Sequence, residues 1–238
     1  DLRPEKPQGA IGYLDNLPER LQELASSEKT EHTRIIMEGT GPTLVPEPLL
    51  DKDHLELYLD YNSPLSDDQQ LMENKLVNMG GSGIFTIKKD SYLELNRLFL
   101  EPRIIHHSSS LIEGLFIMNK NKSPDNKVFV NIRDRHEDIT IFRKGSLLFF
   151  NSFEYHTDED LLYYILFVAD QLRLNPEKFE LVLSCNITDQ SGTYSFLFKY
   201  IRHISFVEQP EGISFSPALK DLARHQYFSL INQYSCGS

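Results

Sequence analysis

Residues Lys127 to Ile187 read KVFVNIRDRHEDITIFRKGSLLFFNSFEYHTDEDLLYYILFVADQLRLNPEKFELVLSCNI. Apolar and polar residues alternate over Val128–Arg133, and the same tendency continues over Asp138–Arg143 and Ser146–Phe153. Alternation with a period of two is typical of strands that bury one face. A tight turn at Lys144–Gly145 joins the second and third of these segments. This part of the stretch therefore predicts three consecutive strands.

A long buried helix and a fourth strand follow. Thr157 and the three acidic residues after it suit a helix start, because side-chain oxygens and negative charge stabilise exposed backbone amides there. The Asn175–Pro176 pair ends the helix, and Phe179–Ser184 reads as a buried strand. An inward stripe marks the helix as a core element; its residues are Leu161, Ile165, Val168 and Leu172.

Working outward, strands and helices also alternate before this stretch. Ile84–Ile87 and Arg103–His107 read as strands, each followed by a helix, and this order implies parallel pairing. Asn119–Asn126 is a polar break and the best internal boundary. The expected helices are Ser91–Leu100 and Ser109–Met118, with another through Leu17, Leu21 and Leu24 and a last one opening at Ser216–Pro217.

Two segments, Gln70–Met79 and Tyr194–Ile201, can be assigned in two ways. Gln70–Met79 suits a strand or a helix. The Gly80–Gly83 segment (GGSG) after it reads as a flexible turn, because a strand follows it. Tyr194–Ile201 has helical spacing but also alternates like a strand, and we favour the helix. His203–Val207 is then a strand.

Composition bounds the class of protein. The chain has 238 residues, a net charge of -11, 40% hydrophobic residues and 25% charged residues. The acidic balance argues against nucleic acid as a partner, and no apolar run reaches the ~18 residues of a membrane span. Cys185 and Cys236 lack any metal or disulfide spacing, which suits a reducing compartment. We therefore expect a cytoplasmic protein with one large domain or two small ones.

The order strand-strand-strand-helix-strand-helix-strand-helix from Lys127 onward resembles one lobe of the actin-like ATPase superfamily, a ribonuclease H-like α/β fold. TLVPEPLL, YLDYN and RIIHHSSSLIEGL are similar to uncharacterised Bacteroides-type proteins with this fold. The resemblance extends distantly to pilus-assembly and cell-division actin homologues. It implies a two-lobe architecture: an incomplete first lobe over residues 1–120, a small inserted α+β subdomain at about 47–83, and a second lobe over residues 127–238.

The resemblance also implies where a nucleotide would bind. Active members carry Asp-x-Gly in the first turn of each lobe, where a glycine admits the phosphate and a carboxylate orients water or metal. Here the matching residues are Asn131 and Arg133, with Thr140 downstream. Cys185 and Asn186 stand where the superfamily has paired glycines. We expect no counterpart of the first-lobe Asp-x-Gly turn within the sequence.

Other candidate groups have plainer explanations. His106 and His107, as neighbours on a strand, should point to opposite faces, one packed and one exposed. His136, Glu137 and Asp138 are expected at a solvated hairpin tip, and Ser108–Ser110 should cap a helix. Cys185 suits a small core residue better than a nucleophile. The tyrosines that could mark a partner surface, if they are not core residues, are Tyr155, Tyr163, Tyr164 and Tyr227.

These observations argue against ATP hydrolysis. They favour a non-catalytic interaction or scaffold module with an unidentified protein partner, no catalytic residues, no metal and no required cofactor. A dimer is left open. The alternative is a nucleotide-binding switch that binds ATP–Mg with weak or no hydrolysis. A sugar or small-molecule kinase would need a catalytic aspartate at the lobe junction, and neither Asp125 nor Asp134 suits that role.

Overall fold

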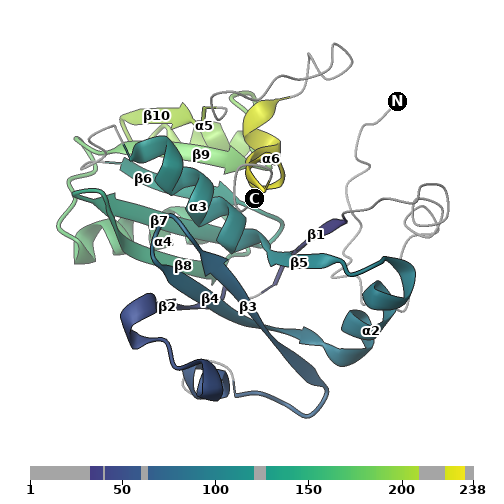
Figure 1. Ribbon diagram of the computed structural model, residues 1–238. Coiled ribbons are helices and arrows are strands. Elements are labelled where there is room, and N and C mark those ends of the chain that lie inside the picture. Colours follow the sequence, from purple (N-terminus) through teal and green to yellow (C-terminus); the bar gives the residue numbers. More distant parts are fainter. Residues whose placement is uncertain (1–32, 40, 60–63, 121–126, 209–222, 234–238) are drawn as a thin grey trace.

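A five-stranded sheet forms the centre of the computed structural model, which describes residues 33–39, 41–59, 64–120, 127–208 and 223–233 (Figure 1). The strand order is β10-β9-β6-β7-β8. β6 pairs antiparallel with β7 and parallel with β9, so it lies at the middle. The strands are β6 (Lys127–Ile132), β7 (His136–Arg143), β8 (Ser146–Glu154), β9 (Glu180–Cys185) and β10 (His203–Phe206).

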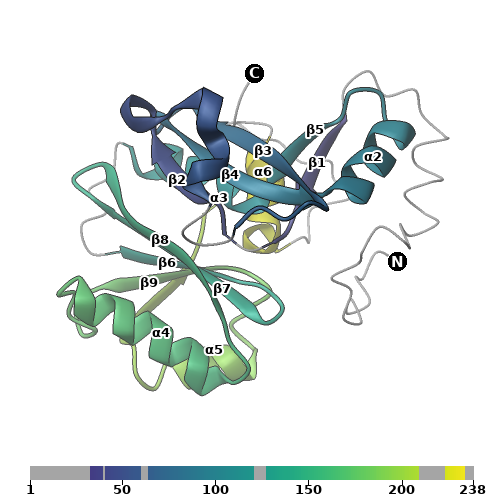
Figure 2. The same ribbon diagram turned by 90° about the horizontal axis from the view of Figure 1, so that it is seen from below.

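Helices cover both faces of this sheet. Figure 2 shows α4 (Asp158–Gln171) and α5 (Gly192–Leu197) on one face, with α3 (His107–Asn119) and α6 (Phe228–Asn232) on the other. The α4 face packs an apolar core from Val128, Ile139 and Ile165, among others. The α3 face has a smaller core that includes Leu111, Phe129 and Phe228. A short 3-10 helix, Arg224–Tyr227, leads into α6.

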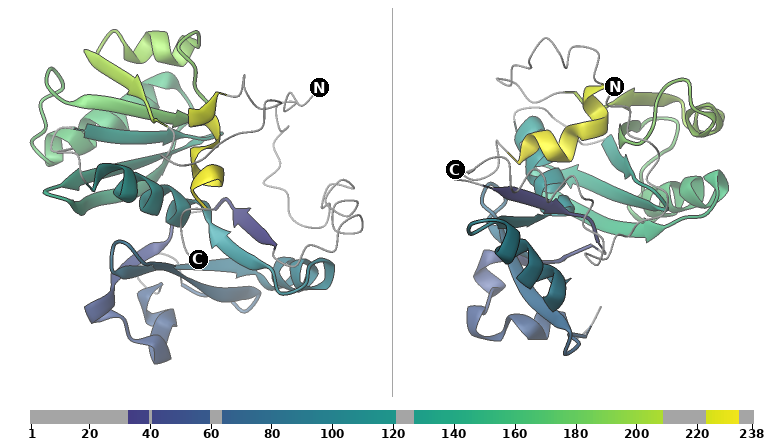
Figure 3. Two further views of the ribbon diagram at one scale, coloured as in Figure 1. Left: turned by 45° about the horizontal axis from the view of Figure 1, so that its top comes forward. Right: turned by 90° about the vertical axis from the view of Figure 1, so that its right-hand side faces the viewer.

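Two smaller sheets come from the preceding residues (Figure 3). β1 (Arg34–Met37) and β5 (Arg103–His106) pair in parallel. Between them in sequence lie β2 (Thr43–Pro46), β3 (Gln69–Leu76) and β4 (Gly81–Lys88), which form an antiparallel sheet of order β2-β4-β3. Helical segments join these strands: the 3-10 helices η2 (Glu47–Leu49) and η3 (Lys52–Tyr58), and α2 (Lys89–Leu98).

Several sequence predictions are confirmed. The three strands, the long helix and the fourth strand of the opening stretch are present as β6, β7, β8, α4 and β9. Thr157 caps α4 in a capping box, in which its side chain accepts from the Asp160 N–H and the Asp160 carboxylate accepts in return. The two open segments resolve as the strand β3 and the helix α5. The helices expected at Leu17–Leu24 and after Ser216 lie outside the described residues.

One pairing prediction is wrong. Alternation implied that the strand at Ile84–Ile87 would pair in parallel, whereas β4 is antiparallel to both β2 and β3. The reason is local: a tight turn before β4 folds the chain back as a hairpin. Gly80 adopts φ +70, and its N–H donates to the Leu76 carbonyl at 2.9 Å. The partner of β5 is therefore β1, the strand before the three-stranded sheet.

Candidate functional site

The turn between β6 and β7 is the position that the sequence singled out. It is a tight turn at Asp134–Arg135, closed by a 2.8 Å hydrogen bond from the Arg133 N–H to the His136 carbonyl. Side chains alternate along β6, so Asn131 and Arg133 share the α3 face. Asp138 lies opposite Asn131 in the register of the two strands. A polar cluster therefore forms on this face at the end of the sheet.

Arg133 turns back over the hairpin and binds Asp138 with two parallel hydrogen bonds. Its Nε and Nη2 donate to Asp138 Oδ2 and Oδ1, each at 2.9 Å. Nη2 also donates to Ser152 Oγ of β8 at 3.1 Å. Arg133 is 5% exposed and Asp138 is fully buried. This planar, bidentate pair has the geometry in which arginine binds carboxylates most strongly.

Asn131 has both ends of its side-chain amide engaged. The amide nitrogen donates to Asp138 Oδ2 at 2.9 Å. Its oxygen accepts from Ser184 Oγ, also at 2.9 Å, and Ser184 lies opposite Asn131 on β9. Asn131 therefore links β6, β7 and β9 within one hydrogen-bonded network.

A histidine from α3 completes the cluster. His107 Nε2 lies 3.1 Å from Asp138 Oδ2 and 3.1 Å from Ser108 Oγ. An ionised carboxylate can only accept, so Nε2 carries the proton. Burial alone would raise the pKa of Asp138. The hydrogen bonds from His107 and Arg133, together with the positive charge of the Arg133 guanidinium group, instead hold this pKa well below its usual range. Asp138 is therefore an anion at neutral pH.

The cluster also reaches the end of the two-stranded sheet. Glu38 follows β1, and its carboxylate lies 3.8 Å from Arg133 Nη1. The Glu38 side chain is 66% exposed, so water screens this ion pair and its contribution is small. The pair matters for its position. Glu38 follows β1 and His107 follows β5, so both strands of the two-stranded sheet end beside the cluster at the same end of the five-stranded sheet.

The remaining predicted site residues lie nearby but do not join the network through side-chain hydrogen bonds. Thr140 is on the same face of β7 as Asp138, fully buried. Cys185 ends β9 with φ +69, and burial raises the pKa of its thiol to about 12. A thiol of that kind is a poor nucleophile. The Asn186 N–H donates to the Ile132 carbonyl at 2.8 Å, which ties β9 to β6 beyond the last strand pair.

Three sequence expectations about this region are wrong. His106 and His107 are both buried, because β5 ends at His106 and α3 begins at His107, so strand alternation does not apply. Their rings lie 4.6 Å apart. Glu137 and Asp138 are fully buried inside β7, not at a solvated tip, since the turn takes only Asp134 and Arg135. The cap of α3 is the His106 side chain, which accepts from the Ser108 N–H.

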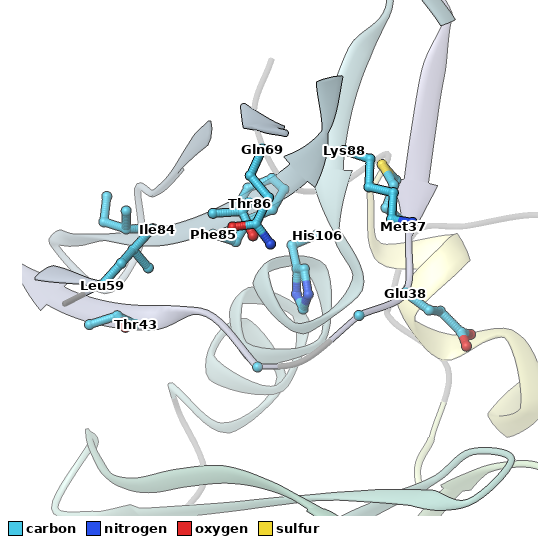
Figure 4. A pocket seen from close by; sticks show the side chains of 12 residues that line it. Met37, Glu38, Thr43, Leu59, Gln69, Ile84, Phe85, Thr86, Lys88 and His106 are labelled. Atoms are coloured by element: carbon cyan, nitrogen blue, oxygen red, sulfur yellow. The ribbon is translucent and has the colours of Figure 1, made fainter. Parts of the chain in front are cut away.

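A pocket of about 220 Å³ lies beside the cluster, between β4 and the segment after β1 (Figure 4). Gln69, Thr86 and His106 surround the hollow, while the Glu38 carboxylate points away from it. The other lining side chains are the polar Thr43 and Lys88 and the apolar Met37, Leu59, Ile84 and Phe85. The pocket is of mixed polarity and smaller than the roughly 300–1,000 Å³ typical of ligand sites. It therefore suits a small group rather than a nucleotide.

Two absences concern the residues that the structure describes. Among them, no group of three or more histidine, cysteine, aspartate or glutamate side chains is placed to hold a metal ion. None of the described helices has the length and apolar character needed to cross a membrane. Within the site itself, the members that the sequence did not reveal are Asp138, Ser184, His107 and Glu38. The strand register brings Asp138 and Ser184 to Asn131. The placement of α3 and of the segment after β1 brings His107 and Glu38 to the same cluster.

Comparison with known proteins places this architecture. The chain matches a crystal structure from Bacteroides thetaiotaomicron VPI-5482, described as a protein with actin-like ATPase fold and unknown function. The TM-score is 0.74 and the identity 26%, over 89% of this chain and 76% of that one. A PilM–PilN type IV pilus biogenesis complex matches with TM-score 0.57 and 12% identity, over 92% of this chain and 84% of that one.

A filament of AlfA bound to AMPPNP aligns with a TM-score of 0.40 and 11% identity, over 90% of this chain and 64% of that one, which is too distant to support an argument. The curated proteins contain no match. The α/β fold is therefore actin-like by structural similarity. A family model for proteins of unknown function, DUF3822, matches residues 10–204, and the chain belongs to this family.

Proposed function

We propose that this protein is a non-catalytic interaction module built on an actin-like fold, with a phosphate turn that no longer suits phosphate. The observation that carries the proposal is the Arg133–Asp138 pair. Its two hydrogen bonds of 2.9 Å hold the guanidinium group over the hairpin, and Arg133 stands at the position where active members of the superfamily carry a glycine. A side chain in that position occupies the space in which backbone amides would approach a phosphate.

The carboxylate in the cluster supports the same conclusion. Asp138 accepts hydrogen bonds from Asn131 and Arg133 and lies within bonding distance of His107. With these groups around both oxygens, it has little capacity left to orient a water molecule or a magnesium ion. Asn131 is neutral and equally committed, so it cannot act as a base. The residues at this turn therefore do not fit Mg–nucleotide chemistry.

In the arrangement we propose, the five-stranded sheet is the second lobe and the β1–β5 pair belongs to the first. The β2-β4-β3 sheet is the inserted subdomain. The 220 Å³ pocket lies where this subdomain meets the cluster. Its mixture of Gln69, Thr86 and apolar side chains suits one amphipathic side chain of a protein partner.

Titration calorimetry with ATP–Mg and with ADP tests the catalytic part. We expect no heat of binding at nucleotide concentrations up to about 1 mM, where even a weak site would register. Micromolar binding by the wild-type protein would overturn the proposal.

The pocket is tested by filling it. Thr86→Trp should abolish recovery of the specific partner in quantitative affinity purification from the native cells, since the indole would occupy the hollow. Leu49→Trp adds the same group at a side chain that is 69% exposed and outside the pocket, and it should retain the partner. Equal recovery with Thr86→Trp and wild-type protein would show that the pocket is not the contact.

The alternative function is a nucleotide-binding switch with little or no hydrolysis. The intact strand order β10-β9-β6-β7-β8 favours it, because the turn that would hold phosphate keeps its place in the sheet. The same calorimetry separates the two functions. Nucleotide binding without phosphate release would support the switch, and the absence of binding would support the interaction module.

A further inference from the structure

An aromatic stripe runs from β8 onto α4, and we define it as Phe149, Phe153, Tyr164, Tyr163 and Phe167. Successive rings lie 6.5, 4.7, 5.4 and 5.9 Å apart between centroids. The strand end of the stripe is half-buried, whereas Tyr163 is 60% and Phe167 46% exposed. Exposed aromatic residues in contact with one another are characteristic of protein interfaces rather than of free surface.

The stripe adjoins an edge strand, β8, and the chain at Gly41 packs on the α3 side of this strand against the Phe150 and Ser152 side chains. β8 is the last strand of the five-stranded sheet in the described part of the chain. The Tyr155 N–H donates toward β7, to the Arg135 carbonyl at 2.9 Å. Backbone groups alternate in direction along a strand, so those of Phe150, Ser152 and Glu154 face away from β7. An exposed edge of this kind is a template for another strand.

Part of this edge carries its own protection. The Ser152 N–H is bonded to the side-chain oxygen of Asn151 at 2.9 Å. A register shift between β7 and β8 occurs at Ile141/Phe142, which places a bulge near Leu148. Bulges bend an edge strand and limit pairing beyond them. The segment from Phe149 to Glu154 lies beyond the bulge. Because the Ser152 N–H is already bonded, the outward groups that this segment offers a new strand are the Ser152 carbonyl and the backbone groups of Phe150 and Glu154.

Charges at the two ends of the stripe identify the occupant. Glu154 and the first turn of α4, Asp158 to Asp160, outnumber the exposed Arg135 beside them and make one end acidic. α4 runs back along β8, so its last turn lies beside the β7–β8 turn, where Arg143 donates to the Leu172 carbonyl at 3.0 Å. Arg143, Lys144 and Arg173 make that end basic, and Asp170 only partly offsets them.

We propose that the aromatic stripe and the β8 edge form a symmetric interface between two copies of this chain, with their β8 strands antiparallel. A two-fold axis through the middle of β8 sets the acidic end of each copy against the basic end of the other. The aromatic centre then meets itself. Self-complementarity of this kind is what a two-fold interface requires. The interface joins two five-stranded sheets and is independent of what the pocket binds.

Sedimentation velocity at protein concentrations from about 1 to about 100 µM tests the interface. We expect the wild-type protein to shift from monomer to dimer within this range. Tyr163→Ser/Phe167→Ser should remain monomeric throughout, with circular dichroism confirming an unchanged fold. Phe198→Ser is the matched control: its ring is 57% exposed, but it follows α5 away from β8, and the dimer should persist.

A charge exchange tests the orientation. Glu159→Lys and Arg173→Glu should each raise the dimer dissociation constant by about tenfold or more, because each sets like charges against each other. The two changes together should restore the dimer. A wild-type protein that stays monomeric at all concentrations would overturn the proposal. So would a dimer that survives loss of both aromatic residues, or one that the combined exchange fails to restore.

Discussion

The two faces of the five-stranded sheet differ most clearly at neighbouring residues of β7. Glu137 and Asp138 are both fully buried. Glu137 points toward the apolar α4 face, where neither carboxyl oxygen has a hydrogen-bond partner, and burial raises its pKa to about 9. Asp138 points toward the α3 face and is an anion among donors. Burial is equal, so the partners alone decide which acid is charged.

This contrast extends over each face. The α4 face is a continuous apolar core, including Val130, Ile139, Leu161 and Leu183, into which Glu137 projects without partners. The α3 face combines a smaller core with the network centred on Asp138. Replacing the acid by its amide should therefore lower the free energy of unfolding on the α3 face and raise it on the α4 face.

The largest effect is expected for Asp138→Asn. This change removes the charge that Arg133 binds and sets an amide donor against the donors around it. An uncompensated buried charge costs about 3–5 kcal/mol, so the free energy of unfolding should fall by that amount in urea denaturation at pH 7. A variant with wild-type stability would mean that the cluster is not formed as described.

A double variant and a pH series sharpen this result. Arg133→Met/Asp138→Asn leaves no unpaired charge and should be more stable than Asp138→Asn alone. The folded pKa of Asp138 is depressed, so its contribution is present above the unfolded pKa near 3.8 and disappears as the pH falls toward the lower folded value. The difference between wild-type protein and Asp138→Asn should narrow in acid.

Glu137→Gln should have the opposite sign. The folded pKa of Glu137 is raised to about 9 from 4.5, so its folded-state protonation supports stability fully below pH 4.5. That contribution is lost progressively as the pH rises through the folded pKa. Glutamine does not ionise and lacks this loss. The variant should exceed the wild-type free energy of unfolding by about 2–4 kcal/mol at pH 7.5 and match it near pH 4.5.

Thermal or urea unfolding at several pH values between 4.5 and 9 provides the measurement. Glu177→Gln is the control, because the Glu177 side chain is 68% exposed and the variant should show no such pH-dependent difference. Parallel stability curves for wild-type protein and Glu137→Gln would contradict the assignment of Glu137 as a neutral buried acid.

Gly114→Ala probes the packing of the α3 face. A Cβ at this position would overlap the side-chain amide of Asn232, which is buried in α6. α6 would have to shift, and overpacking of this kind costs about 1–3 kcal/mol. Differential scanning calorimetry should show a lower Tm. An unchanged Tm would indicate that α6 is held loosely on α3.

The smallest effect is expected at the start of α4. Thr157→Ala removes one half of the capping box and should lower the free energy of unfolding by about 1 kcal/mol. Thr157→Ser keeps the hydroxyl group and should recover most of this loss. Urea denaturation of both variants distinguishes the cap from a general effect of the smaller side chain.

How much the sequence could predict depends on the range of each interaction. The alternation around Val130 and the acidic start after Thr157 are local signals, and both elements formed where expected. The turn between β6 and β7 was misplaced, because Asp134–Arg135 lacks the Asn-Gly or Asp-Gly pair that marks such hairpins. Because of this error, Glu137 and Asp138 were predicted to be exposed, and Asp138 was not recognised as the centre of the site.

Local composition and periodicity thus determined the strands of the central sheet and its long helix, and the alternation placed Asn131 and Arg133 at the end of the first of those strands. The tertiary structure alone decided what those residues do. Asn131 and Ser184 are 53 positions apart in sequence, and His107 lies 31 positions from Asp138. Such pairs depend on register and helix placement, which no short-range pattern encodes.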